Sequence, residues 1–486
     1  MEDKRLKRIV SLPGVWWATL ALVSSLVTFL AVDGCYDLYD SISYKVAAIN
    51  WFESGVADKL RTPGYPFILW ICDWMGDGAG LALWVIQTAL YCWSVVMFRR
   101  LVGVFGLGKW PGRVVMLFYI LWPTFPTMMS GVCSEAPSVS LSVIMTWYII
   151  ALMGNPSWRG VSRVAVLLLV MLSIRPAFIF IPVVLVVLSA VMALKCHSKR
   201  RLAGMLTVPA IVAIGAVMGY NAYIKSVYGL RYGTLVVSIN RILAAPGVVS
   251  LRPELWNEED RWLVEKMEVN RYLPWNEYNQ FYELHNVYEP ARYQSIADSI
   301  WSGNRLKEIR RVAVRMVKGM SESAVRLFNE RTSHGGILKE YKARVAVSQY
   351  MTDARQAYRY PTYKSRPLTV FNKLSIPFWV IFLLVSGWGC YFVYAIFRRR
   401  TVVDYNRLFL YLLVSGGYIS IYVGAYADFG RLFVSTLPMA VLLLVYTLTL
   451  CFKIRGLGRI WSGHSAKARA HEIHKLEVSD DQSDNN

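Results

Sequence analysis

Residues 14–32 read GVWWATLALVSSLVTFLAV, an apolar run without a charged side chain that is long enough to cross a bilayer as a helix. The run lacks the small-residue cleavage pattern of a signal peptide, so we interpret it as a retained span. Asp33 follows it at once. Four basic residues precede it, namely Lys4, Arg5, Lys7 and Arg8. This stretch predicts an integral membrane protein whose first helix leads into a polar, acidic segment.

The composition of the 486-residue chain agrees with that interpretation. Hydrophobic residues make up 55% of it and aromatic residues 14%, which is more apolar than soluble domains usually are. The formal net charge of +21 would suit nucleic-acid binding if the basic residues formed one face. They fall instead in short clusters beside the apolar runs. We therefore predict the lipid bilayer as a partner and no nucleic acid.

Apolar windows of spanning length recur along the chain and predict about ten transmembrane helices. The fold class that follows is an all-α integral membrane protein. The windows are residues 14–32, 78–98, 114–130, 137–153, 164–174, 177–194, 202–224, 375–397, 407–426 and 432–451.

The distribution of Lys and Arg predicts the orientation, because cytoplasmic loops carry an excess of basic residues. With the N-terminus inside, alternate counting places every short basic cluster on the cytoplasmic side. These clusters are Arg99 with Arg100, Arg159 with Arg163, Lys195 with 199–201, 398–400, and Lys453 with Arg455. The first loop, Glu135, Arg175 and Arg431 then face outward.

Four regions follow from this pattern. Residues 1–225 form an N-terminal membrane body, and residues 226–373 a mainly helical exterior domain. Residues 374–452 are the C-terminal membrane helices, and residues 453–486 are a cytoplasmic tail, polar enough to be largely disordered. The many basic residues of the exterior domain form either a solvated face or a contact with anionic lipid or an acidic glycan.

The first loop is the main candidate for function. Residues 40–66 read DSISYKVAAINWFESGVADKLRTPGYP, and Asp33 and Asp37 stand just before them. Ionisable groups held at a membrane surface are costly, which makes them functional candidates. Group transfer is one reaction that such acids and arginines could carry out. The cell exterior offers no nucleotide sugars, so the transfer of a sugar there needs a lipid-linked donor. A carboxylate would act as general base and arginines would hold the phosphate as it leaves.

Several motifs resemble the GT-C superfamily of polyprenyl-phosphate-sugar-dependent glycosyltransferases. That group includes the lipid A aminoarabinose transferase, protein O-mannosyltransferases and O-antigen glucosyltransferases. The motifs extend over most of the membrane body. They are Asp40-Ser41 with Tyr44, Arg61 to Pro66, Ser134-Glu135, Arg175-Pro176, and Gly430-Arg431 with Pro438.

The resemblance implies roles for individual residues. Asp40 is the expected general base with Asp37 as its nearest substitute, and Glu135 is the expected second acid. The residues expected to bind the donor phosphate are Arg61, Arg175, Arg431 and Lys45. Those expected to line the substrate cleft are Tyr44 and Tyr65. Each has a structural alternative: a helix N-cap for Asp40, helix-dipole stabilisation for Glu135, and interfacial or solvated contacts for the others.

The resemblance further implies a GT-C-like body with an exterior helical cap in a bacterial inner membrane, its active site facing the periplasm. The expected enzyme transfers a hexose or pentose from undecaprenyl phosphate to a glycan or glycolipid acceptor, with inversion and with no metal or cofactor. The first loop lacks the adjacent acidic pair of the protein mannosyltransferases, which leaves the base open between Asp37 and Asp40. A flippase or transporter of a lipid-linked sugar or small anion is the alternative, and a structural or receptor-like protein ranks last.

Overall fold

Among the residues that the computed structural model describes, six helices are long and apolar enough to cross a membrane. The chain is therefore a multi-pass membrane protein by helix length and hydropathy. The structure describes residues 13–31, 34–37, 41–231, 233–238, 290–291, 294–295, 298, 378–398, 403–424 and 433–454. The six candidate spans are Gly14–Ala31, Gly76–Val104, Glu135–Gly154, Pro176–Lys195, His197–Tyr228 and Trp379–Phe397.

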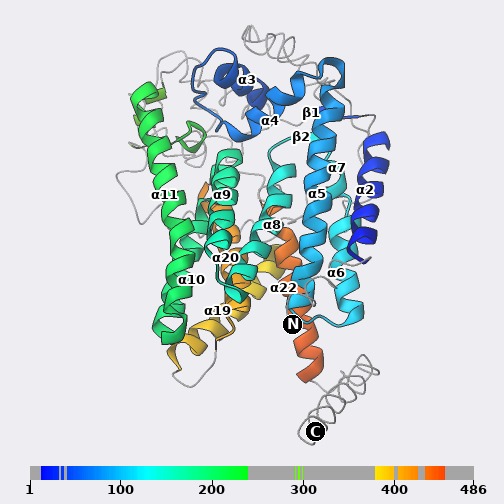
Figure 1. Cartoon of the computed structure of the whole chain (residues 1–486), viewed down its shortest axis with the longest axis vertical. Coiled ribbons are helices and arrows are strands. Elements are labelled where there is room, and N and C mark those ends of the chain that lie inside the picture. The colour runs from blue at the N-terminus through cyan, green and yellow to red at the C-terminus, as the bar shows by residue number, and fades with distance from the viewer. Residues whose placement is uncertain are drawn as a thin grey trace, which may run out of the picture.

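The described part of the chain is helical apart from one two-residue parallel strand pair (Figure 1). The elements up to the first long polar stretch are α2 (Pro13–Ala31), β1 (Tyr36–Asp37), α3 (Ser41–Phe52), α4 (Gly64–Asp73), η1 (Gly76–Gly78), α5 (Ala79–Val104), α6 (Lys109–Leu121), α7 (Thr124–Met128), β2 (Gly131–Val132), α8 (Glu135–Gly154), α9 (Trp158–Ile174), η2 (Pro176–Ile179), α10 (Phe180–Lys195), η3 (His197–Lys199) and α11 (Arg200–Tyr228). The remaining ones are α19 (Phe378–Phe397), α20 (Tyr405–Gly424) and α22 (Leu437–Ile454).

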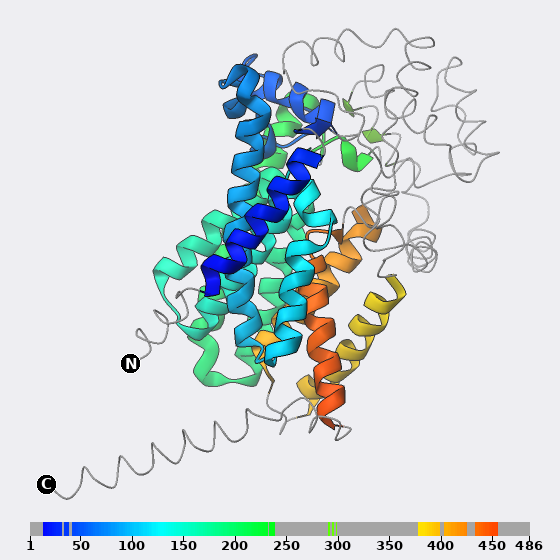
Figure 2. The same cartoon turned by 90° about the vertical axis from the view of Figure 1, so that its right-hand side faces the viewer.

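Helix α8 lies at the centre of the bundle and α2 at its edge. Most side chains of α8 are buried, and the helix packs against both α5 and α9. Helix α2 lies obliquely across α5 and α6 (Figure 2) and leaves much of its apolar surface exposed. A charge-free helix with an exposed apolar surface is what lipid contact requires.

The expectation of one continuous span over residues 114–130 is wrong. Helix α6 ends at Leu121, because Trp122 takes an extended conformation with ψ 120° ahead of Pro123. The short helix α7 and strand β2 follow. The broken segment runs directly into α8, so an irregular stretch of backbone stands beside the N-terminus of the central helix.

The other windows predicted from hydropathy coincide with described helices, with shifted ends. Helix α9 begins at Trp158 and has 17 residues, so it is longer than the expected window over 164–174. Helix α20 is described over Tyr405–Gly424, and the last two residues of its predicted window lie outside the described residues. Helices α9, α20 and α22 are not among the six candidate spans, and the total of about ten spans stays a prediction.

The bundle has two chemically different ends. The C-termini of α5 and α10 and the N-terminus of α9 bring Arg99, Arg159 and Lys195 to one end, shown at the bottom of Figure 1. There the Lys195 Nζ donates to the Arg398 carbonyl oxygen at 3.2 Å. Helices α3 and α4 and the N-terminus of α8 lie at the other end. The regions expected over 226–373 and 453–486 fall largely outside the described residues.

Candidate functional site

The strand pair fixes the first loop beside the N-terminus of α8. Tyr36 aligns with Gly131 and Asp37 with Val132 in a parallel register. The Ser41 hydroxyl donates to the Val132 carbonyl oxygen at 2.6 Å. The start of α3 and the start of α8 are thereby held side by side, although about ninety residues separate them.

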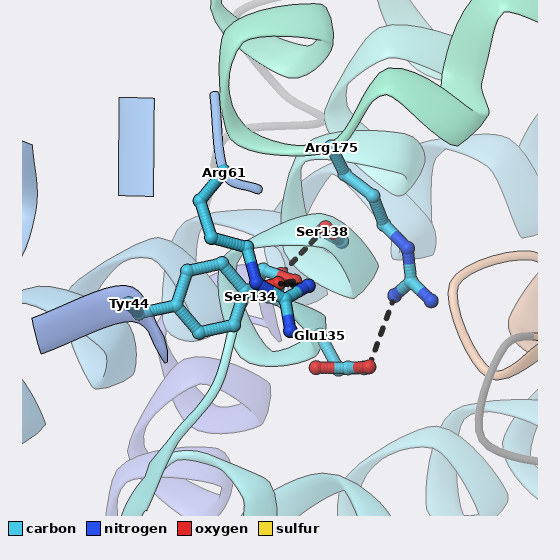
Figure 3. Close-up of polar contacts among 6 residues, drawn as sticks. All are labelled: Tyr44, Arg61, Ser134, Glu135, Ser138 and Arg175. Carbon is cyan, nitrogen blue, oxygen red and sulfur yellow. Dashed lines mark hydrogen bonds and ion pairs between the residues drawn. The ribbon is translucent and has the colours of Figure 1, made fainter. Parts of the chain in front are cut away.

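A buried ion pair lies at the first turn of α8. Glu135 opens the helix and is only 3% exposed, and the Arg175 side chain is 9% exposed. The Nη1 of Arg175 lies 3.5 Å from the Oε1 of Glu135. Arg175 follows the last residue of α9 with extended backbone (φ −147°), since the residue before Pro176 disfavours the helical conformation. That extension turns Arg175 out of its helix and toward α8 (Figure 3).

The guanidinium of Arg175 is not fully satisfied by this ion pair. Its Nη1 is buried and makes no hydrogen bond to any residue that the structure describes. A buried donor without an acceptor costs about 1–3 kcal/mol, and more when it is charged. The arrangement therefore has a donor available for an incoming anionic oxygen next to Glu135.

Gly64 brings the first loop against the same place. A Cβ built on Gly64 would lie 2.6 Å from the Ser173 carbonyl carbon and 2.7 Å from the Ile174 nitrogen. Only glycine permits this approach, because besides the Ser173 hydroxyl the added Cβ would meet the backbone of α9, which cannot swing away. The N-terminus of α4 thus packs on the last turn of α9, immediately before Arg175.

Arg61 is held over a tyrosine at the edge of the ion pair. Its guanidinium carbon lies 4.4 Å from the centre of the Tyr44 ring, and its Nε donates to the Ser43 hydroxyl at 2.8 Å. The Tyr44 and Ser134 hydroxyls share a hydrogen bond of 2.7 Å. In Figure 3 the side chains of Arg61 and Arg175 extend toward the first turn of α8, where Ser134 and Glu135 lie. The structure thus places Tyr44, Arg61, Glu135 and Arg175 close together, and their roles stay predictions.

Sequence reasoning missed Asp58, a buried carboxylate that shapes the loop carrying Arg61. Its Oδ1 accepts hydrogen bonds from the backbone N–H groups of Leu60 (2.8 Å) and Arg61 (2.7 Å), and its Oδ2 accepts one from Asn50 (2.8 Å). Burial raises the pKa of Asp58 above its ordinary value, although these hydrogen bonds and the charge of Arg61 lower it. The available signal was an Asp in a polar loop, followed two and three residues later by residues other than proline, which permits a typical Asx arrangement.

Neighbouring elements hold the same loop in place. The Trp51 indole N–H donates to the Arg61 carbonyl oxygen at 3.1 Å, and the Leu235 N–H donates to the Lys59 carbonyl oxygen at 2.8 Å. The Tyr228 hydroxyl, at the end of α11, donates to the Ala57 carbonyl oxygen. The loop that carries Arg61 is therefore held by hydrogen bonds from three separate parts of the chain.

Two further predicted site residues, Tyr65 and Lys45, are buried in the protein. Tyr65 is fully buried, and its hydroxyl donates to the Gln87 Oε1 at 3.4 Å. Gln87 in turn donates through its Nε2 to the carbonyl oxygens of Met129 and Gly131, at 2.9 and 3.1 Å. These bonds satisfy the backbone where α7 meets β2. Lys45 is almost fully buried on α3, so the alternative of a solvated charge does not hold for it.

Other predicted residues cannot be placed with the cluster. Asp40 and Arg431 lie outside the described residues, as does Asp33. Asp37 belongs to β1, where only its backbone is described. Their roles stay predictions.

The cluster combines a buried carboxylate, two guanidinium groups and hydroxyls at a helix N-terminus. Such a set can bind and orient an anion such as a phosphate, because arginine forks match phosphate oxygens and the helix N-terminus favours negative charge. Within the described residues, no group of three His, Cys, Asp or Glu side chains is placed to hold a metal ion.

No protein-family model matches the chain, and a search of curated proteins finds no match either.

Proposed function

We propose that the chain is a membrane glycosyltransferase. It transfers a sugar from a polyprenyl-phosphate donor, undecaprenyl phosphate in a bacterium, to a cell-surface glycan or glycolipid such as O-antigen or lipid A. The observation that carries the proposal is the buried Arg175, whose Nη1 forms an ion pair with Glu135 at 3.5 Å but makes no hydrogen bond to a described residue. A guanidinium in that state suits a ligand phosphate better than it suits a purely structural role.

Arg61 supplies the second cation of the proposed phosphate site. It stands on the opposite side of the first turn of α8, held by Ser43 and by the ring of Tyr44. Two guanidinium groups placed before the donor arrives need little reorganisation when the leaving phosphate gains charge. Gly64 keeps Arg61 close to the end of α9 and so to Arg175.

The carboxylates divide between two proposed tasks. Glu135 is paired with Arg175, which suits it to orienting that guanidinium rather than to taking a proton. The general base is left to Asp40 or Asp37. In the proposed step the acceptor hydroxyl oxygen attacks the anomeric carbon while the base removes its proton. The bond from the anomeric carbon to the phosphate oxygen breaks, polyprenyl phosphate leaves, and the anomeric configuration inverts.

The charge distribution supports an outward-facing site. The basic clusters at Arg99, Arg159 and Lys195 share the end of the bundle opposite to Glu135. Because positive charge marks the cytoplasmic side, the cluster would face the exterior, the periplasm in a bacterium. A lipid-linked sugar is the donor that reaches that side.

The test compares wild type with Asp40→Asn, Asp37→Asn and Arg175→Lys. Mass spectrometry of the surface glycan measures sugar addition, and binding of undecaprenyl phosphate to the purified full chain measures donor affinity. We expect one of the Asp→Asn variants to lose transfer with binding retained. Arg175→Lys keeps the positive charge beside Glu135 but loses the planar fork, so its affinity should fall about tenfold to a hundredfold.

Arg163→Lys is the matched control, since Arg163 is exposed on the same helix near its other end. It should leave both readouts unchanged. If wild type and Arg175→Lys bind undecaprenyl phosphate with equal affinity, Arg175 does not bind the donor phosphate and the proposed phosphate site is wrong. Sugar-independent movement of a lipid-linked substrate by wild type, without any transfer, would favour the flippase alternative instead.

A further inference from the structure

Helix α4 has an exposed aromatic face outside the candidate site. Phe67 and Ile71 on α4 and Trp74, the residue directly after it, follow one another at a spacing of three to four residues and are 44%, 37% and 70% exposed. The opposite face packs into the protein through Tyr65, Leu69 and Cys72. An amphipathic helix normally turns its apolar face inward, but here both faces are apolar, and one of them meets the surroundings of the protein.

The aromatic side chains of this face form a packed array. The ring of Trp70 stacks on Phe52 of α3 at a centroid distance of 5.3 Å, and it meets Trp74 edge-on at 4.7 Å. Phe67 lies 6.0 Å from Trp70 and 5.4 Å from Phe52. The face is therefore a pre-formed surface shared by α3 and α4 rather than a set of separate side chains.

The exposed face is continuous along the chain with the surface of a spanning helix. Helix α4 ends at Asp73, and the candidate span Gly76–Val104 begins three residues later. Along α5 the exposed positions are again apolar: Leu81, Val85 and Trp93. The aromatic face thus stands where a membrane span enters the bilayer, the level at which Trp residues concentrate.

We propose that α4 is an interfacial helix whose aromatic face lies in the headgroup region of the bilayer, against the first part of the acyl chains. Charge on α4 does not provide this attachment. Residues 62–98 contain no Lys or Arg, and Asp73 and Asp77 flank the end of α4. Burial of apolar and aromatic area holds the helix at the surface, so its partner is a zwitterionic bilayer as readily as an anionic one.

The position of α4 in the bilayer is independent of the proposed function. It affects the candidate site, because Arg61 precedes α4 by three residues and Gly64 packs the start of α4 against the end of α9. An interfacial α4 holds that loop at the depth of the lipid headgroups.

Spin-label accessibility in single-copy nanodiscs tests the proposal on the full chain. Labels are placed at Ile71→Cys and Met75→Cys, both at exposed positions, in a background in which the four cysteines that are not buried are Ala. Collision with oxygen, which partitions into lipid, is compared with collision with a water-soluble nickel chelate. The lipid-facing control is Val85→Cys on α5, and the aqueous control is Ser54→Cys on the connection between α3 and α4.

We expect the oxygen-to-nickel collision ratio at positions 71 and 75 to exceed that at position 54 and to approach that at position 85. The ratio should be the same in phosphatidylcholine and in phosphatidylcholine mixed with phosphatidylglycerol. A ratio at positions 71 and 75 equal to that at position 54 would overturn the proposal. So would a high ratio that appears only with phosphatidylglycerol, or a low nickel collision rate seen only when two copies share a nanodisc, which would make a second copy the occupant.

Discussion

At the scale of single residues, Asp58 decides how Arg61 is presented. Its carboxylate satisfies the Leu60 and Arg61 N–H groups and the Asn50 amide, so Asp58→Ala leaves three donors without their acceptor. At about 1–3 kcal/mol for each buried donor left unsatisfied, the loop should open. Asp58→Asn keeps an oxygen for the two backbone N–H groups and loses only the bond from Asn50. We expect Asp58→Ala to be clearly the less stable variant in thermal unfolding of detergent-solubilised protein.

The difference in stability between wild type and Asp58→Asn should depend on pH in a definite direction. The folded-state pKa of Asp58 lies above its ordinary value because burial outweighs its hydrogen bonds. The folded chain then binds the proton more readily than the unfolded chain. Protonated Asp58 therefore contributes to the stability of the fold, and this contribution is lost as the pH rises through the folded-state pKa. Relative to Asp58→Asn, wild type should be most stable at acidic pH and should lose stability as the pH rises above about 4, the ordinary pKa of an aspartate. A wild-type advantage that grows with pH would mean that the hydrogen bonds dominate and that the pKa is lowered.

The structure brings together some of the residues that the sequence motifs singled out, and their roles stay predictions. Arg61, Glu135 and Arg175 were predicted as one site and do gather at the first turn of α8. Asp58 escaped because an acidic residue in a polar loop gives no sign of burial until Asn50 and Tyr228 close over that loop. Tyr65 was assigned to the substrate cleft, but its contact with Gln87 forms only when α4 packs on α5, which no local pattern encodes.

At the scale of elements, the contact between α4 and α9 couples the first loop to the arginine at the end of α9. Gly64→Ala would push a methyl group into the Ser173–Ile174 backbone, and α4 has to move away from α9. Overpacking of this kind costs about 1–3 kcal/mol. We expect a lower unfolding temperature and, if both arginines hold the donor, weaker binding of undecaprenyl phosphate. Gly103→Ala on α5, where an added Cβ meets nothing within 4 Å, is the control and should be neutral or slightly stabilising. Equal behaviour of the two variants would show that the approach of α4 to α9 is not tight.

Hydropathy predicted helices better than it predicted their ends and interruptions. Long windows such as the one that became α5 were found because about twenty apolar residues in a row admit few alternatives. The window over residues 114–130 failed because a window average ignores Pro123, which ends α6 by constraining Trp122. Helix α4 was not predicted as a helix at all, since ten residues between two loops are too few for a spanning window.

At the scale of the whole molecule, sidedness connects the fold to the proposed function. The basic end and the cluster end are opposite, and each is defined by contacts between elements far apart in the sequence, such as Lys195 with Arg398 and Glu135 with Arg175. If the basic end is cytoplasmic, nucleotide-linked sugars cannot reach Glu135 and a lipid-linked donor is required.

Thiol labelling in intact cells measures that sidedness directly. Ser54→Cys lies on the exposed connection at the cluster end, and Asn155→Cys lies on the exposed connection between α8 and α9 at the basic end. We expect a membrane-impermeant maleimide to label Ser54→Cys in intact cells and Asn155→Cys only after permeabilisation, each above the background of the native cysteines in wild type. We expect this outcome from the positive-inside rule. The reverse orientation would place Arg99, Arg159 and Lys195 outside, against the rule at each of these short loops. The reverse labelling pattern would place Arg61, Glu135 and Arg175 on the cytoplasmic side, where soluble activated sugars are available, and the reason for a polyprenyl-phosphate donor would be lost.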